Sequence, residues 1–421
     1  MGTSACAQDC VAYRRATIET LGKGGRIENA TLVVRGGKIE AIGKDVKIPD
    51  DAKVVDAAGC TIMPGVIEPY FELPIAGSGG DAGQPQTIVV RGRTITLPGQ
   101  ARLPGASFTR VADNLNPYDR VFRPFVRSGL VGMNLVASGQ GQAAVIQLTP
   151  ATPEQMLVQP EGVLFASVSN QSDSLDIVRA RLESVARLKR TGGTTPGATS
   201  PASAGGPAGG GILSQMTNQM KPWVDVYEGK APVFVHVANA ATVAHLAKVM
   251  PTHKDVRWVL LGTGDCFAET IDALRGQKVT VIVRPGLELE PNTRNRMNIA
   301  ARLYQAGIPF AFSQTGNLQA AGGAAGAFGG AAGGGNPTAD LMTSQDFPLF
   351  TVAMLVKCGL PRQAALEALT LRPAQLLGLE QTLGSIESGK AASFLVFQGD
   401  PLDPQSRLKT VLIGGKTAYE N

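Results

Sequence analysis

The sequence predicts an α/β fold: a TIM-like (β/α)8 barrel joined to a small β-sandwich that both chain ends build. Short apolar runs alternate with helical segments through the middle of the 421 residues, and such runs are typical of strands covered by helices on both faces. Seven or eight strand–helix units can be counted, which fits a barrel. Both chain ends are rich in short strands and Gly-Gly turns, which indicates a separate sheet domain.

The two chain ends share one pattern. "TLVVRGGKIEAIG" (31–43) alternates apolar and polar residues around Gly36-Gly37, as expected of a hairpin with a two-residue turn. "LKTVLIGGKTAYEN" (408–421) has the same kind of Gly-Gly hairpin between β-rich runs. We therefore expect residues 12–63 and 384–421 to form one composite sandwich, with the barrel over residues 64–383.

The barrel elements follow from apolar runs and helix signals. Helices are expected over 172–190, over 292–307 with Gly307 as the C-terminal cap, and over 364–379, where Pro373 is expected to separate two short helices. An open doubly wound sheet is the alternative, but no Gly-x-Gly-x-x-Gly follows any strand. The expected strands are 129–137, 141–148, 162–169, 232–238, 256–262, 279–283 and 308–313, besides the one after Pro64-Gly65.

Two Gly- and Ala-rich stretches interrupt this pattern. Residues 191–211 separate two helices, and residues 320–338 follow the last expected barrel strand. Such tracts have few side chains to bury, so we expect flexible loops. The second tract follows the C-terminal end of a barrel strand, where active-site loops lie. It either covers the mouth of the barrel or is a solvated loop without a function of its own.

Composition excludes several functional classes. Hydrophobic residues make up 43% and charged residues 17%, as in ordinary folded proteins, and no run of about 18 apolar residues predicts a membrane span. The net charge is +5, with scattered Lys and Arg, so a nucleic-acid partner is not expected. Ala5-Cys6-Ala7 resembles the end of a secretory signal, which points to a periplasmic or extracellular location. Cys6 and Cys10 either form a disulfide or are isolated thiols.

Several stretches carry a family resemblance in consecutive order. They are "GGKIEAIG", "DAAGCTIMPGVIE", "VADNLNPYDRVFRPFVRSGLVGMNLVASGQGQAAVIQL", "LTLRPAQLLGLEQTLGSIESGKAASFLVFQGDPL" and "VLIGGKTAYEN". Together they resemble the amidohydrolase superfamily, in particular the exported bacterial members of its imidazolonepropionase-like branch. The resemblance covers nearly the whole chain apart from the Gly-rich tracts, and it implies the same sandwich–barrel–sandwich order.

The resemblance implies metal-assisted hydrolysis of C–N bonds in amides. In this family, one or two divalent ions lower the pKa of a bound water and polarise the carbonyl. In the family, the metal ligands are two His on strand one, a Lys or Glu on strand four, and one His each on strands five and six. An Asp on strand eight also takes the proton of the water as a general base.

This sequence departs from that ligand pattern. "VIEPYFE" has Tyr70 and Glu72 at the two strand-one positions. "VFVHVANA" keeps His236 on strand five, whereas Gly262 and Thr315 stand at the positions of the strand-six His and the strand-eight Asp. His236 and Glu72 are the only good donors left, and a catalytic zinc ion usually has three protein ligands.

Other side chains near these strand ends complete the candidate site. We expect Gln314 to line a pocket together with Tyr70, Gly262 and Thr315. Asp265 is either a carboxylate in the mouth or an acid that caps the following helix. His236 is either a residual metal ligand or a core histidine, and His245 and His253 are expected to be solvated or locally hydrogen-bonded.

Three functional hypotheses follow. The first is a catalytically degenerate amidohydrolase without a cofactor, which acts through binding or assembly as a homo-oligomer or as a hetero-oligomer with an active homologue. The second is an active hydrolase of non-peptide C–N bonds, in which Glu72, Asp265 and His236 work with one Zn-like ion or without metal. The third is a structural building block of an extended assembly.

Overall fold

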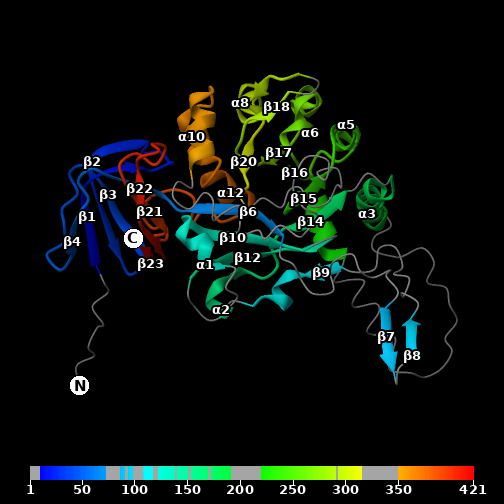
Figure 1. The fold of residues 1–421 in the computed structure, drawn as a ribbon, viewed down its shortest axis with the longest axis horizontal. Coiled ribbons are helices and arrows are strands. Elements are labelled where there is room, and N and C mark those ends of the chain that lie inside the picture. Colours follow the sequence, from blue (N-terminus) through cyan, green and yellow to red (C-terminus); the bar gives the residue numbers. More distant parts are fainter. Residues whose placement is uncertain are drawn as a thin grey trace.

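A computed structural model of the chain describes residues 10–72, 86–90, 93–97, 108–116, 122–137, 140–149, 153–168, 172–190, 220–290, 293–314 and 349–421. Figure 1 shows a sheet domain beside a larger α/β body, with a β7–β8 hairpin (Gln86–Val90 and Arg93–Leu97) apart from both. The predicted loops at 191–211 and 320–338, Thr315, Cys6 and the segment 5–7 lie outside the described residues.

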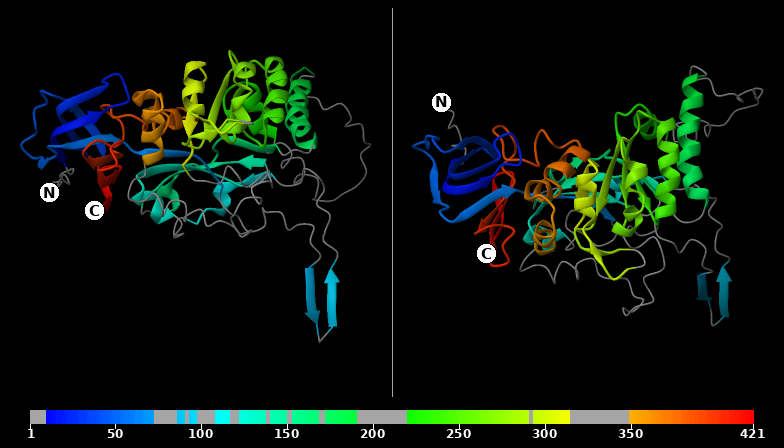
Figure 2. Two further views of the ribbon diagram at one scale, coloured as in Figure 1. Left: turned by 45° about the horizontal axis from the view of Figure 1, so that its top comes forward. Right: turned by 90° about the horizontal axis from the view of Figure 1, so that it is seen from above.

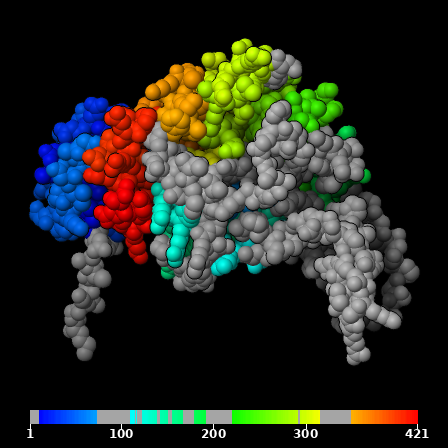
Figure 3. Space-filling view, viewed as in Figure 1, coloured from blue at the N-terminus to red at the C-terminus, as the bar shows by residue number. Residues whose placement is uncertain are grey.

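The sheet domain is one eight-stranded sheet that combines both ends of the chain. Its order is β23-β22-β21-β5-β1-β2-β3, and β4 pairs with β1. The space-filling view shows the C-terminal residues lying against the N-terminal ones (Figure 3). The strands are β1 (Cys10–Glu19), β2 (Arg26–Arg35), β3 (Lys38–Gly43), β4 (Lys53–Asp56), β5 (Cys60–Pro64), β21 (Phe394–Gln398), β22 (Arg407–Ile413) and β23 (Lys416–Glu420).

The interior of this domain is apolar because alternate residues of its strands face one side. Ile18, Leu32 and Ile62 are fully buried, and Tyr13 packs edge-on against Phe394 with ring centroids 5.5 Å apart. The predicted boundaries of the composite domain stay a prediction, although β5 is hydrogen-bonded to β21 and so joins the two ends of the chain.

The α/β body contains two sheets. One has the order β13-β12-β10-β6, and the other β20-β17-β16-β15-β14-β11-β9. From β14 to β20 the strands β14, β15, β16, β17 and β20 are parallel neighbours, as predicted from their apolar runs. The bounds are β6 (Val66–Glu72), β9 (Phe108–Arg110), β10 (Leu130–Val136), β11 (Gln140–Gln142), β12 (Ala144–Gln147), β13 (Leu157–Gln159), β14 (Leu164–Val168), β15 (Pro232–Val237), β16 (Arg257–Leu261), β17 (Val279–Val283) and β20 (Phe310–Phe312).

The two sheets meet at two places. The segment 140–147 gives β11 to one sheet and β12 to the other. On the opposite side the turn between two helices connects β6 and β20, because Leu369 O accepts the N–H of Ile67 and Ala368 O accepts the N–H of Phe312. Among the described residues no strand ladder joins β6 to β20. The predicted α/β class with an appended sheet domain is confirmed at this level, while closure into a (β/α)8 barrel is not.

Helices cover the outer face of the parallel strands. α10, α8, α6, α5 and α3 follow one another around the body in Figure 1, and the view from above in Figure 2 separates them from the strands. Another helix spans residues 220–227. The remaining bounds are α1 (Phe122–Arg127), α2 (Pro153–Met156), α3 (Ser172–Arg190), α5 (Ala240–Val249), α6 (Gly264–Ala268), α7 (Ile271–Leu274), α8 (Ile299–Gln305), α10 (Phe350–Lys357), α11 (Arg362–Glu367) and α12 (Leu371–Leu376).

Two helix predictions can be compared with these bounds. Gly307 follows the end of α8 with φ +70°, as predicted for a glycine after a C-cap. The expected break at Pro373 is wrong in position, because the chain leaves the helix at 368–370 and Pro373 lies in the first turn of α12. A proline is tolerated there because the first N–H groups of a helix have no intrahelical acceptor.

Candidate functional site

The candidate site begins on β6, where a buried carboxylate joins two strands. Glu68 is 1% exposed, and its Oε1 accepts the N–H of Tyr70 at 3.2 Å. Its Oε2 accepts the N–H of Gln314 at 2.8 Å, just beyond the end of β20. The hydroxyl of Ser313 also donates to the carbonyl of Tyr70 at 3.4 Å. Glu68 therefore connects the strand-one stretch to Gln314, the residue before the strand-eight position of the family pattern.

A second buried polar residue supports the same stretch of β6. The β6–β10 pairing shifts register between Met133 and Leu135, which interrupts the regular ladder. Asn134 is fully buried there, and its Nδ2 donates to the carbonyl of Pro69 at 3.0 Å. Its Oδ1 has no hydrogen-bond partner among the described residues. The side chain thus replaces a ladder bond that the irregular register has removed.

The two strand-one candidates have different surroundings. Tyr70 is buried, and burial, together with the nearby negative charge of Glu72, raises the pKa of its hydroxyl well above the ordinary value. A phenol with a raised pKa stays protonated at neutral pH and is a poor metal ligand. Glu72 is half-buried at the last position of β6.

The strand-five and strand-six positions lie on neighbouring strands. His236 is buried near the end of β15 and is paired in register with Leu261 of β16. Gly262 follows Leu261, and its N–H donates to the carbonyl of Ile282 at 3.3 Å. A Cβ added to Gly262 would lie 2.9 Å from Cγ2 of Val237 and 3.3 Å from Cε2 of Phe267. The packing therefore leaves little room for a larger residue at this position.

The first turn of α6 holds Asp265 in a local hydrogen-bond arrangement. Asp265 is exposed, and its carboxylate accepts from the hydroxyl of Thr263, the residue at the N-cap. Cys266 beside it is buried, and burial raises the pKa of its thiol, which opposes thiolate formation. Asp265 thus lies in the first turn of α6 but does not cap the helix, because Thr263 occupies the N-cap and no side chain makes a capping hydrogen bond there.

The structure brings some predicted residues together. Glu68 links the β6 stretch of Tyr70 and Glu72 to the backbone of Gln314, while His236 and Gly262 lie on adjacent strands. Within the described ranges, no three His, Cys, Asp or Glu side chains form a group that could hold a metal ion. His245 is exposed on α5, and His253 lies with its ring edge-on to Tyr227 in a turn.

Sequence reasoning missed Glu68 and Asn134. The available signal for Glu68 was its period-two spacing with Tyr70 and Glu72, which would put the three side chains on one face of a regular strand. No comparable signal marks Asn134, because its role depends on a register shift between two strands. Within the described residues, no helix is long and apolar enough to span a membrane.

Sequence comparisons match limited parts of the chain. The model of the amidohydrolase family matches residues 347–419. A dihydroorotase of Geotalea daltonii is 41% identical over 59 residues, which is 12% of this chain and 14% of that protein. An imidazolonepropionase of Vibrio cholerae is 32% identical over 85 residues, which is 20% of this chain and 21% of that protein. The match thus spans less than a quarter of the length of either relative.

Structural comparisons cover nearly the whole chain. An amidohydrolase from Thermotoga maritima superposes with a TM-score of 0.70 at 19% identity, over 98% of this chain and 100% of that one. Molinate hydrolase superposes with a TM-score of 0.51 at 13% identity, over 98% and 95% of the two chains. At these identities the similarity shows a shared fold.

Proposed function

The chain is an imidazolonepropionase-like protein of the amidohydrolase superfamily, and from this premise we propose that it is catalytically degenerate and works through binding or assembly. The observation that carries the proposal is the packing at Gly262. The Cβ of any side chain there would crowd Val237 and Phe267, so the imidazole that the superfamily pattern requires at the strand-six position would have to displace them.

The other described donors do not fit a superfamily metal centre. Tyr70 keeps its proton because burial raises the pKa of its hydroxyl. Both oxygens of Glu68 accept backbone N–H groups, which are interactions of a structural carboxylate. His236 and Glu72 remain as good donors, fewer than the three protein ligands of a catalytic zinc site. We therefore derive no hydrolytic step through a metal ion.

The proposal includes an architecture and a mode of action. The two sheets form one (β/α)8 barrel, which the shared segment 140–147 and the hydrogen bond from the Gln314 N–H to Glu68 support. The protein acts as a homo-oligomer, or with a metal-bearing homologue, in the periplasm or outside the cell. The resemblance to exported family members supports that location.

Elemental analysis of the purified protein tests the proposal. After incubation with zinc, manganese or iron salts and desalting, we expect well under one metal ion per chain and no hydrolysis of an amide, lactam and ester panel. Light scattering should show a defined oligomer, or a complex with an added metal-bearing homologue.

The opposite results would favour an active hydrolase. About one ion per chain, removed by a chelator together with activity, would overturn the proposal. Activity that falls at least tenfold in both Glu72→Gln and His236→Ala would assign hydrolysis to the half-buried carboxylate at the mouth and the buried imidazole. A concentration-independent monomer that forms no complex with the homologue would contradict the assembly role.

A further inference from the structure

A cavity lies at the opposite edge of the parallel strands from the candidate site. It has a volume of about 380 Å³ and is lined by the first residues of β15, β16 and β17 together with residues of α12. Parallel strands begin at one edge of a sheet and end at the other, so the openings are separated by the strand length. At about 3.3 Å per residue, a five-residue strand separates them by about 16 Å.

The charged residues of this cavity have one sign. Arg257, Lys278 and Arg372 line it, and none of the described lining residues is an Asp or Glu. Arg257 uses its Nη2 to donate to the carbonyl of Lys230 at 2.7 Å, which holds the guanidinium without neutralising it. Lys278 forms no ion pair within the part of the chain that the structure describes, and it is exposed to solvent.

The positive charge of the third cation, Arg372, is partly compensated by a carboxylate. Arg372 Nη2 lies 3.2 Å from Glu367 Oε2, and its Nη1 donates to Oε1 of Gln375 at 3.1 Å. Glu367 does not line the cavity, so the ion pair fixes the Arg372 side chain without adding a carboxylate to the cavity wall. The cavity therefore keeps an excess of positive charge, which favours an anionic ligand.

Most of the remaining wall is apolar, although Gln277, Thr280 and Gln375 also line the cavity. Trp258, Val259, Val279 and Pro309 line it, and Trp258 is 2% exposed. A volume of about 380 Å³ is within the range of small-molecule sites, about 300–1,000 Å³, and exceeds the needs of a bare inorganic ion. The ligand should thus combine an anionic group with an apolar body.

We propose that this cavity binds a small phosphate monoester, with the phosphoryl group beside Arg257, Lys278 and Arg372 and the apolar body against Trp258. A phosphoryl group carries close to two negative charges and three acceptor oxygens, so it can engage several cations at once. A carboxylate has one charge and two oxygens and uses fewer of these donors. The proposal does not depend on the function proposed for the other edge of the strands.

Tryptophan fluorescence provides a direct test, because the chain has two tryptophans and Trp258 alone lines the cavity. In a Trp223→Phe variant the signal comes from Trp258. Phenyl phosphate should change it saturably, benzoate should bind at least tenfold more weakly, and benzyl alcohol should have no saturable effect. Calorimetry with phenyl phosphate on the unaltered chain repeats the measurement if Trp223→Phe does not fold.

Charge variants identify the site. Arg257→Ala and Lys278→Ala should each weaken phenyl phosphate binding about tenfold, as expected for the loss of one charge-assisted hydrogen bond. Lys254→Ala removes an exposed lysine that does not line the cavity and should leave affinity unchanged. Absence of binding, equal binding of benzyl alcohol, or affinity unchanged in Lys278→Ala would each overturn the proposal.

Discussion

At the residue scale, Glu68 shows how a polar group can be buried in the interior of this fold. A carboxylate removed from water is costly unless its oxygens receive hydrogen bonds. Here each oxygen accepts one backbone N–H, from Tyr70 and from Gln314. The arrangement ties the end of β6 to the segment after β20 and makes Glu68 a structural acceptor.

Replacing Glu68 with Gln should therefore destabilise the protein. One oxygen becomes an NH2 group that faces a backbone N–H, and the unsatisfied buried donors cost about 1–3 kcal/mol. Glu72→Gln, at the half-buried end of the same strand, should cost less than about 1 kcal/mol. Urea unfolding followed by circular dichroism measures both. Equal losses in the two variants would refute a special role for Glu68.

The site was partly predictable at this scale. The sequence alone showed that the ligand positions are changed to Tyr70, Glu72 and Gly262. They could be located because the surrounding residues resemble the metal-ligand motifs of the family. The crowding around Gly262 could not, because it comes from Val237 on the neighbouring strand and Phe267 on the next helix. Contacts between side chains distant in the sequence depend on packing, which a single sequence does not reveal.

At the element scale, the two Gly-Gly turns were predicted as hairpins and form the turns of β2–β3 and β22–β23. Their contact with each other was not predicted. Ala392 connects them, since its N–H donates to Gly37 O and its carbonyl accepts the N–H of Gly415, both at 2.8 Å. Local turn chemistry is visible in sequence, whereas the meeting of two turns requires the assembled sheet.

This contact yields a prediction about Gly37. Its φ is +79°, and an added Cβ would lie 2.6 Å from Gly414 O, so alanine there meets both backbone strain and a clash. Gly25 has a φ of +61° but no atom within 4 Å of an added Cβ, so Gly25→Ala meets the strain alone. We expect Gly37→Ala to lose about 1–3 kcal/mol more than Gly25→Ala. Equal melting temperatures in calorimetry would contradict this reasoning.

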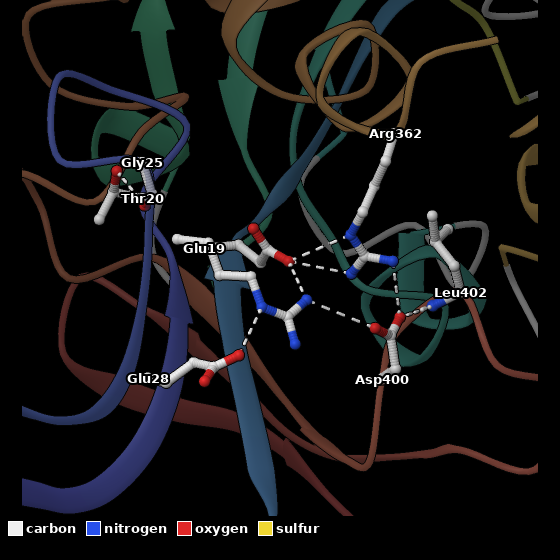
Figure 4. Close-up of polar contacts among 8 residues, drawn as sticks. Glu19, Thr20, Gly25, Glu28, Arg362, Asp400 and Leu402 are labelled. Atoms are coloured by element: carbon white, nitrogen blue, oxygen red, sulfur yellow. Dashed lines mark hydrogen bonds and ion pairs between the residues drawn. The ribbon is translucent and has the colours of Figure 1, made fainter.

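At the scale of the whole molecule, charged residues join the sheet domain to the α/β body. Arg362 of α11 donates to Oε1 of the buried Glu19 at the end of β1, at 2.9 Å through Nη2. Its Nη1 donates to Asp400, which follows β21, also at 2.9 Å. Figure 4 shows the Arg362 guanidinium between the two carboxylates. The order of elements was predictable from sequence, but this junction between distant segments was not.

The junction makes stability depend on pH through Asp400. Burial alone would raise the pKa of this carboxyl, but the N–H of Leu402 and the guanidinium of Arg362 outweigh burial and lower it below its ordinary value of 3.8. A lowered pKa in the folded state means that the unfolded chain binds the proton more readily. The stabilisation is therefore complete well above pH 3.8 and is lost as the pH falls through the folded-state value.

Asp400→Asn should remove this contribution. At pH 7 we expect the variant to be less stable by about 1 kcal/mol, because the carboxylate is partly exposed and solvent screens the pair. Below about pH 4 the difference from the unaltered protein should shrink, since the native carboxylate also loses its charge. Asp403→Asn is the matched control, because Asp403 is exposed nearby and forms no ion pair with any described residue. Melting temperatures of all three proteins from pH 2.5 to 7 provide the measurement. A constant difference between Asp400→Asn and the unaltered chain would show that the ion pairs of Asp400 with Arg362 and Arg26 do not make the stability depend on pH.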